Sequence, residues 1–598
     1  MTGYRTILFL PLLLLAGNGT LRTQALPDSG AESRFHELER DELTEQAAQT
    51  DESPVLDFSP FDPNPGKRDY FVKIRSRVRV GLERSRGFSD GQFLGSEYES
   101  LQRAEFSNKR GVSGGILLSK KAGERLLGDF VSGYGMVTDA GPIATLLVGD
   151  YFVEAGQGIA LWRGFDYGKG PDVVSAVRRS GRGIMPYRSS DENAFLRGAA
   201  ASLRFDPCSI ALFFSRRSLA ASVDSPGVVS SISASGIVRT LSEDSRRNRL
   251  TERLTGLRCS VDFGNHGSAG LTCYRSGFSL PLRLSGEGKF SGEGYSVAAV
   301  DYHFNLPRGL LFGEWTILGG APAGIWGATL TPSRTVDLIG SFRNYPARMV
   351  SLHGLGFGER GDTFNEEGIY LGFRLKLSRG TVLSAYFDQY RFPEGSGSGP
   401  FADGGRQWFV RAAFHPHQGL DWSLQFERKS SGQRDRSLSP GGLSRSNTVV
   451  QAIDRIRTHL DLRLTPEVRV RGRFEKVYLR SRAVPGVEQG TMLYEEISCS
   501  PLPGLSAGMR IVFFLTGSYD TRLYEFEDDL RDAASLPVLS GRGERSYILV
   551  RYGFSGSSGI SAKYSRTTRD DVRRLGTGPD ELPGNHDDRI GLQLDLVF

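Results

Sequence analysis

Apolar and polar residues alternate over many separate stretches of the chain from residue 69 onward. In the stretch 70–82, Val72, Ile74 and Val78 share one parity, and basic residues take the other. Since successive side chains of a strand point to opposite faces of a sheet, each stretch predicts an amphipathic β-strand. Helical periodicity is nearly absent from the same region. The pattern therefore predicts an all-β domain over 69–598.

The stretches have the length of strands that cross a bilayer. A tilted transmembrane strand needs about 9–11 residues, and these stretches run from roughly nine to fourteen. We count about 24 strands, with a range of about 22–26, of which about five precede residue 150 and about 19 follow residue 194. An even number allows both ends of a barrel to lie in the periplasm.

Tight turns alternate with long polar stretches between the predicted strands. A soluble β-sandwich has no reason to keep its long loops at one end, whereas outer-membrane barrels have short periplasmic turns and longer external loops. The sequence therefore predicts a large transmembrane antiparallel β-barrel in the bacterial outer membrane, in contact with lipid and lipopolysaccharide. The long stretches are 218–252, 345–365, 392–405, 429–454, 518–542 and 567–587.

Basic residues occupy the polar face of several strands. A basic residue that faces lipid at the midplane costs roughly 2–4 kcal/mol. A row of three would then cost on the order of 6–12 kcal/mol, comparable with the stability of a whole domain. We therefore predict that these rows face the lumen, either as an anion-favouring lining or neutralised by Asp and Glu across the lumen. The candidates are Lys73, Arg75, Arg77, Arg79, Arg374, Lys376, Arg463, Arg469, Arg471 and Arg473.

The chain ends in RIGLQLDLVF, in which apolar residues alternate up to the final Phe598. This ending resembles the C-terminal signature by which the barrel assembly machinery of Gram-negative bacteria recognises its substrates. The resemblance implies that Phe598 belongs to an assembly signal and that 589–598 is the closing strand. An ordinary edge strand that ends on Phe is the alternative.

The N-terminal region predicts export and a small periplasmic segment. Arg5, the apolar run at 7–16 and the small residue Ala25 are typical of a secretory signal peptide over 1–25. The following segment, 26–68, predicts one short helix and a Pro-rich stretch.

The stretch 151–193 is predicted to be a long loop that folds into the lumen as a constriction. A barrel of this size encloses a wide lumen, and such barrels are commonly plugged. Glycines would let the loop approach the wall closely, and aromatic side chains would fill space. A surface-exposed receptor loop is the alternative. The candidate constriction residues are Gly156, Gly158, Trp162, Phe165, Tyr167 and Tyr187.

Several motifs in this region, among them Gly149-Asp150-Tyr151, Gly156-Gln157-Gly158 and Pro186-Tyr187, carry a resemblance. With NEEGIYLGFRL at 365–375, they resemble a family of predicted outer-membrane barrels catalogued as helix-hairpin-helix domain-containing proteins. The resemblance implies a barrel over 70–598 and the same location. The helix-hairpin-helix repeats of the family have no counterpart in 26–68, so nucleic-acid binding is not expected.

Motifs for catalysis, cofactors and metals are weak. The stretch 164–170 has a Gly-Lys pair but lacks the rest of a phosphate-binding loop, and no spacing selects a Ser/His/Asp triad. We therefore expect neither a cofactor nor an enzyme. For the acidic stretches 525–532 and 585–588, a divalent-cation site at an external loop is the alternative, and solvated charged loops are favoured because no EF-hand spacing is present.

The cysteines and the net charge do not change these predictions. Cys259 and Cys273 flank a turn and can face each other across a hairpin, which leaves a disulfide open. The net charge of +6 is too small to argue for nucleic acid.

These patterns predict a pore, transporter or secretion conduit with an arginine-rich lumen. The alternatives are a non-transporting scaffold or receptor with periplasmic or secretion partners, and a barrel hydrolase.

Overall fold

The computed structural model describes residues 69–598 apart from 164–167, 194, 225–226, 234, 285–289, 350–351, 362, 395–402, 436–446, 482–485 and 556. The predicted signal peptide and periplasmic segment lie outside the described residues. In the described part of the chain, no helix is both long and apolar enough to cross a membrane.

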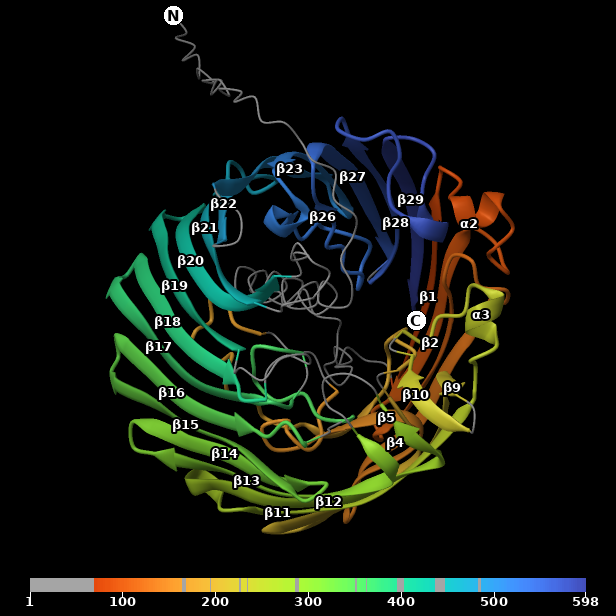
Figure 1. Cartoon of the computed structure of the whole chain (residues 1–598), viewed down its shortest axis with the longest axis vertical. Coiled ribbons are helices and arrows are strands. Elements are labelled where there is room, and N and C mark those ends of the chain that lie inside the picture. The colour runs from red at the N-terminus through yellow and green to blue at the C-terminus, as the bar shows by residue number, and fades with distance from the viewer. Residues whose placement is uncertain are drawn as a thin grey trace, which may run out of the picture.

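The described chain forms a closed antiparallel barrel of 24 strands (Figure 1). The first seven are β1 (Tyr70–Gly81), β2 (Tyr98–Asn108), β3 (Val112–Lys120), β4 (Phe130–Ala140), β5 (Ile143–Glu154), β7 (Leu196–Phe205) and β8 (Cys208–Leu219). The next seven are β11 (Leu250–Asp262), β12 (Gly267–Arg283), β13 (Ser291–Leu306), β14 (Gly309–Leu318), β15 (Ala321–Ser333), β16 (Val336–Tyr345) and β17 (Glu366–Ser378). The last ten are β18 (Thr381–Phe392), β19 (Asp403–His417), β20 (Leu420–Asp435), β21 (Asn447–Arg463), β22 (Val468–Ser481), β23 (Val487–Leu502), β24 (Leu505–Thr516), β27 (Arg542–Ser555), β28 (Ser558–Arg569) and β29 (His586–Val597).

Each barrel strand pairs with its neighbour in the chain, and β29 pairs with β1 to close the ring. The closing register runs from Lys73 opposite Val597 to Gly81 opposite Arg589. Closure leaves no open sheet edge, so every backbone group of the wall has a partner within the bilayer. The C-terminal stretch is therefore the closing strand, as the alternation predicts.

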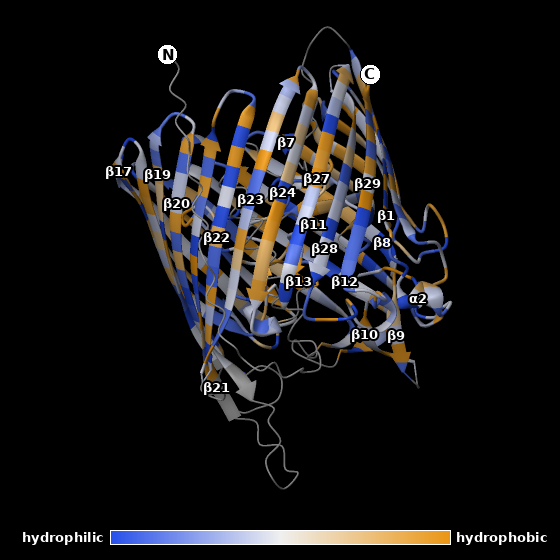
Figure 2. Ribbon diagram, turned by 90° about the horizontal axis from the view of Figure 1, so that it is seen from above, coloured by the Kyte–Doolittle hydropathy of each residue, from blue (hydrophilic) through white to orange (hydrophobic). Residues whose placement is uncertain are grey.

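The remaining elements lie in the long connections. The helices are α2 (Arg86–Ser89), α3 (Leu241–Asp244), η1 (Gly264–His266), η2 (Tyr519–Thr521) and η3 (Gly578–Asp580), and the short strands are β6 (Gly183–Pro186), β9 (Ala221–Asp224), β10 (Val228–Ile232), β25 (Leu523–Tyr524) and β26 (Val538–Leu539). With the exception of η1, they lie between strands at one end of the barrel, where α2, β9 and β10 extend in Figure 2. The opposite end has short turns. This is the predicted asymmetry of periplasmic turns and external loops.

The outer surface of the wall is apolar. Along β17, Ile369, Leu371 and Phe373 are exposed, whereas Tyr370 between them is fully buried, and Figure 2 shows such alternation on many strands. Exposed aromatic residues gather next to the short turns, as in the interfacial girdles of transmembrane barrels; they include Phe205, Phe263, Phe304, Tyr552 and Phe554. A closed barrel with this exterior is a bacterial outer-membrane protein, and its apolar band lies in lipid.

Several predicted boundaries are wrong. β5 continues to Glu154, where it pairs with β6, so the first residues of the predicted loop 151–193 are a strand. β20 and β21 extend into the predicted loop 429–454, since their ladder continues to the pair Asp435 and Asn447. In each case backbone pairing continues beyond the point where the apolar alternation stops.

We expect that an arginine on the outer surface destabilises the barrel according to depth. Leu371→Arg, in the middle of β17, should lower the free energy of unfolding by about 2–4 kcal/mol. Leu377→Arg, on the same strand and face beside a short turn, should cost about 0–1 kcal/mol. Guanidinium unfolding in phospholipid vesicles measures both, and equal costs would contradict a lipid-facing surface.

Candidate functional site

The connection between β5 and β7 lies inside the ring of strands (Figure 1). Its apolar side chains join a cluster with the inner face of the wall, and Ile159, Ala160 and Val177 are fully buried there. The wall also holds its backbone, because the Tyr274 hydroxyl donates to the Ala160 carbonyl at 3.1 Å and the Tyr370 hydroxyl to the Val173 carbonyl at 2.8 Å. The connection is therefore packed on the wall from β12 to β17.

A buried carboxylate of the wall fixes the start of this connection. Glu314 of β14 accepts backbone N–H bonds from Gln157 at 2.7 Å, Ile159 at 3.1 Å and Ala160 at 2.8 Å. Gly156 has φ +57°, and a Cβ there would lie 2.7 Å from the Glu314 carboxylate. Only glycine allows the backbone to approach Glu314 this closely in that conformation.

Lys169, further along the same connection, enters a buried charge network on the wall. Its ammonium group pairs with Asp388 at 2.6 Å and also with Glu359. Arg343 completes the network, with contacts of 2.5 Å to Glu366 and 2.8 Å to Asp388. Burial lowers the pKa of Lys169, but the Asp388 and Glu359 carboxylates outweigh burial and raise it. In the sequence, this lysine stood out only as part of a Gly-Lys pair that lacks the rest of a phosphate-binding loop.

The predicted constriction residues lie in different places. Gly158 accepts a backbone bond from Leu355 of the β16–β17 connection at 2.8 Å, and the buried Trp162 donates its backbone N–H to His353 of the same connection at 2.8 Å. Tyr187 instead packs with Phe195 beside β3 and β4. Phe165 and Tyr167 lie outside the described residues.

A second connection, between β24 and β27, also turns inward, and β26 appears within the ring in Figure 1. We call residues 525–532 of this connection the acidic segment. Glu525 and Glu527 are buried, with exposed fractions of 3% and 0%. The interpretation of this stretch as a solvated external loop is therefore wrong. Sequence composition cannot distinguish a hydrated acidic loop from one that enters a basic cavity.

The acidic segment pairs with a series of basic residues that we call the basic wall: Lys73, Arg75, Arg79, Arg103, Arg471, Arg473, Arg510, Arg545 and Lys563. Glu525 contacts Arg473 at 2.7 Å and Arg510 at 2.8 Å, and Glu527 contacts Arg545 at 2.5 Å and Lys563 at 3.2 Å. Asp528 contacts Arg471 at 2.6 Å, and Asp529 contacts Arg79 at 2.8 Å. Asp532 contacts Arg75 at 2.5 Å, Arg103 at 3.3 Å and Lys73 at 3.6 Å.

The other predicted basic residues are placed as follows. Arg77 donates to Gln593 at 2.7 Å and to the Arg531 carbonyl at 2.6 Å. Arg374 pairs with Asp337 at 2.7 Å, and Arg469 pairs with Asp461. Lys376 and Arg463 are exposed near the short turns. Of the two roles considered for these rows, these ion pairs favour carboxylate neutralisation.

The basic wall lowers the pKa values of the acidic segment. Burial alone would raise the pKa of Glu527, but Arg545 and then Lys563 outweigh burial and lower it to about 2. Asp528 and Asp532 have pKa values below their usual range, where Arg471 and Arg75 respectively outweigh burial. These groups are therefore ionised at neutral pH.

A polar cavity lies between the two inward connections. Lys169, Gly170 and Pro171 line it from the first, and Arg522, Leu523 and Tyr524 from the second. The wall contributes Tyr386, Phe409, Gln425, Glu427, Arg455, Arg457 and Glu475. Both signs of charge are therefore present in this cavity.

The wall carboxylates that pair with the basic residues and bind the first connection were not predicted from the sequence. Glu314, Asp388 and Glu496 were not singled out, although each lies on the inward parity of its strand. Glu496, on β23, pairs with Arg471 and Arg510. That parity was a usable signal: a carboxylate on the face predicted to be inward marks a partner for an inward arginine. The four cysteines, all of them described residues, are unpaired. Cys259 lies opposite Leu271 and Cys273 opposite Leu257, so the two are offset in register.

Comparisons with known proteins give structural similarity only. No family model and no curated protein matches the chain, so the resemblance to the helix-hairpin-helix family stays a prediction. Among solved structures, a mutant of the ferric enterobactin receptor PfeA from Pseudomonas aeruginosa is 10% identical, with a TM-score of 0.44 over 89% of this chain and 80% of that one. The copper transporter OprC is 10% identical, with a TM-score of 0.43 over 88% and 80%. The siderophore receptor PirA from Acinetobacter baumannii is 9% identical, with a TM-score of 0.42 over 88% and 81%. Similarity at this level assigns neither a family nor a cargo.

Proposed function

We propose that the protein is an outer-membrane transporter for anionic cargo, whose lumen is closed at rest by its own loops. The observation that carries the proposal is the acidic segment bound along the basic wall. A chain of carboxylates already occupies this row of cations. The row is therefore suited to bind an extended anion or a series of anionic groups.

The two inward connections are held by different forces, which suggests which one moves. The first has an apolar cluster, the Glu314 bonds and the buried Lys169 network. The acidic segment has ion pairs to the wall along its length, besides the apolar packing of Leu530 on Tyr547 and Leu549. An incoming anion can replace a carboxylate in such pairs. We infer that anionic cargo competes with the acidic segment for the basic wall. Displacement of the acidic segment then widens the lumen beside the cavity.

The ends of the barrel suggest its further partners. Phe598 is half exposed beside the closing strand, and its backbone pairs with Val72 of β1. This position is consistent with a signal read by the barrel assembly machinery. The alternative function is a non-transporting scaffold or receptor with periplasmic or secretion partners.

Removal of charge from the acidic segment should open the lumen. The variant Glu525→Gln/Glu527→Gln/Asp528→Asn replaces ion pairs with weaker neutral contacts and leaves basic residues without counter-ions. We expect a several-fold higher conductance in planar bilayers and a reversal potential shifted toward anion selectivity. The matched control is Asp520→Asn in the same connection. The Asp520 side chain is 42% exposed, and its distance of 4.0 Å from Arg522 is long for an ion pair. It should conduct like the wild type.

For each variant, a difference in gel migration between heated and unheated samples verifies that the barrel is folded. A folded triple variant that conducts no more than the wild type would contradict the transporter and favour the scaffold or receptor.

Acidification should open the wild-type lumen. A carboxylate whose pKa is lowered in the bound state stabilises that state fully above its ordinary pKa of 4.5, and this contribution disappears as the pH falls through about 2. Conductance should therefore be constant from pH 7 to about 5 and rise from about 4.5 downward. Asp520→Asn should retain this profile, whereas Glu527→Gln should conduct more already at pH 7. A flat wild-type profile down to pH 2.5 would argue against ion pairs as the closing force.

A further inference from the structure

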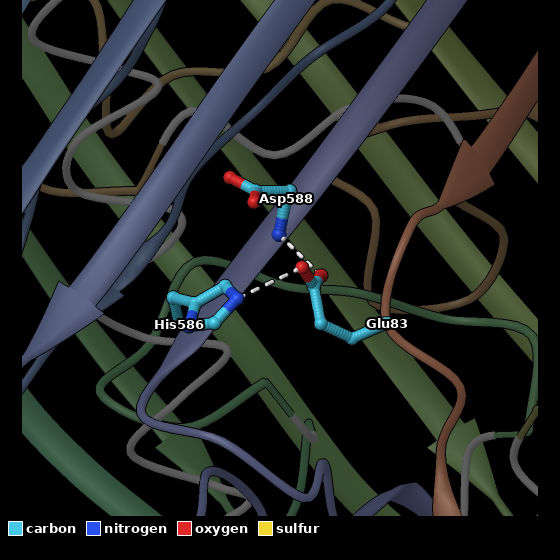
Figure 3. A group of neighbouring side chains, drawn as sticks. All are labelled: Glu83, His586 and Asp588. Carbon is cyan, nitrogen blue, oxygen red and sulfur yellow. Dashed lines mark hydrogen bonds and ion pairs between the residues drawn. The ribbon is translucent and has the colours of Figure 1, made fainter.

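Three potential metal ligands meet where the first and last strands of the barrel leave the membrane. His586 and Asp588 begin β29, and Glu83 follows β1 shortly after its end (Figure 3). One ligand atom from each residue lies within 4.8 Å of the others. His586 Nε2 is 3.3 Å from Glu83 Oε1, and the other Glu83 oxygen accepts the Asp588 backbone N–H at 2.6 Å.

The spacing suits a small divalent ion. Metal–ligand bonds of about 2.0–2.2 Å in tetrahedral geometry place ligand atoms about 3.4 Å apart. The His586–Glu83 contact already has this length. The ion would lie between His586 Nε2 and Glu83 Oε1. Asp588 Oδ would need to move inward by about 1.4 Å at most, from 4.8 Å to about 3.4 Å.

The neighbours of Asp588 permit this movement. The Tyr564 hydroxyl donates to Asp588 Oδ1 at 3.0 Å and would hold the carboxylate in the orientation that presents its other oxygen to the ion. Arg566 lies at 3.6 Å from Asp588 Oδ2, and its side chain is 45% exposed. The Asp588 side chain is 10% exposed, but a pair of this length whose arginine is open to solvent contributes little free energy, so Arg566 competes weakly with a metal ion for Asp588.

The group is at the outer rim, on the lipid side of the wall. His586 and Asp588 share the parity of Ile590 and Leu592, which are exposed on the apolar surface below them. His586 is partly exposed, so an ion can arrive from the external side. Three protein ligands leave a fourth position for water or another external ligand.

We propose that Glu83, His586 and Asp588 bind one divalent transition-metal ion that links β1 to β29 at the barrel seam. The imidazole ligand favours Zn²⁺ and related ions over Ca²⁺, which takes six to eight oxygen ligands. The inference goes beyond transport and does not depend on it. A bound ion would stabilise the one ladder that joins the two ends of the barrel, the pairing of β29 with β1.

The test uses the full-length refolded barrel in detergent after chelator treatment. Calorimetry measures Zn²⁺ binding during a titration and the thermal unfolding midpoint with and without Zn²⁺. We expect one equivalent of Zn²⁺ to bind and to raise the thermal unfolding midpoint. His586→Ala should weaken binding by at least about tenfold and remove the shift in the midpoint. Glu83→Gln, whose amide oxygen can still accept the Asp588 N–H, should also weaken binding and serves as the variant that preserves the local fold.

The matched control is His415→Ala. His415 lies 3.4 Å from Asp421 at the short-turn end and belongs to no three-ligand group of described residues. It should bind Zn²⁺ like the wild type. Loss of binding in His415→Ala equal to that in His586→Ala would mean adventitious surface binding and overturn the site. Ca²⁺ binding as tight as Zn²⁺ binding would overturn the transition-metal assignment.

Discussion

Backbone hydrogen bonding inside hydrocarbon is the constraint on which this structure depends. An unpaired N–H or C=O in the bilayer core costs several kcal/mol, so a sheet that spans the membrane must close on itself. The pairing of β29 with β1 satisfies that requirement. Closure also creates an interior. Because side chains alternate along a strand, an apolar exterior sends the polar residues of the same strands inward.

A lumen surrounded by 24 strands is too wide for wall side chains to fill, and the connections at the external end supply the remaining material. On one half of the wall, apolar packing and a small number of buried charged contacts bind the β5–β7 connection. The other half receives the acidic segment through a series of ion pairs, with Leu530 packed on Tyr547 and Leu549. The two halves therefore differ in how their contents respond to pH, ionic strength and competing anions.

The two kinds of contact have different energetic consequences. Buried ion pairs add little net stability relative to apolar packing, because both charges must be removed from water. The loss of one partner is nevertheless costly, since it leaves the other charge buried without compensation. The basic wall therefore needs anions in place at all times. The acidic segment meets this need within the chain, and anionic cargo would meet it equally well.

The sequence by itself determined the local features of this protein. Period-two alternation identified the strands, their number and the lipid-facing side, because lipid selects against charge at every outward position independently of the rest of the chain. The alternation of short and long connections gave the orientation, and the last ten residues gave the closing strand. The inward parity of Arg75 and Arg473 also followed from local pattern.

Only the tertiary structure decided which groups meet inside. Asp532 contacts Arg75, 457 positions away in the chain, and Gln157 binds Glu314, 157 positions away. Glu83 and His586 come together only because the barrel closes. No local pattern encodes these pairs, since each depends on the order of strands around the ring and on how far a connection reaches into the lumen. The acidic segment has the composition of a hydrated loop, and it is the surrounding cations that make burial favourable.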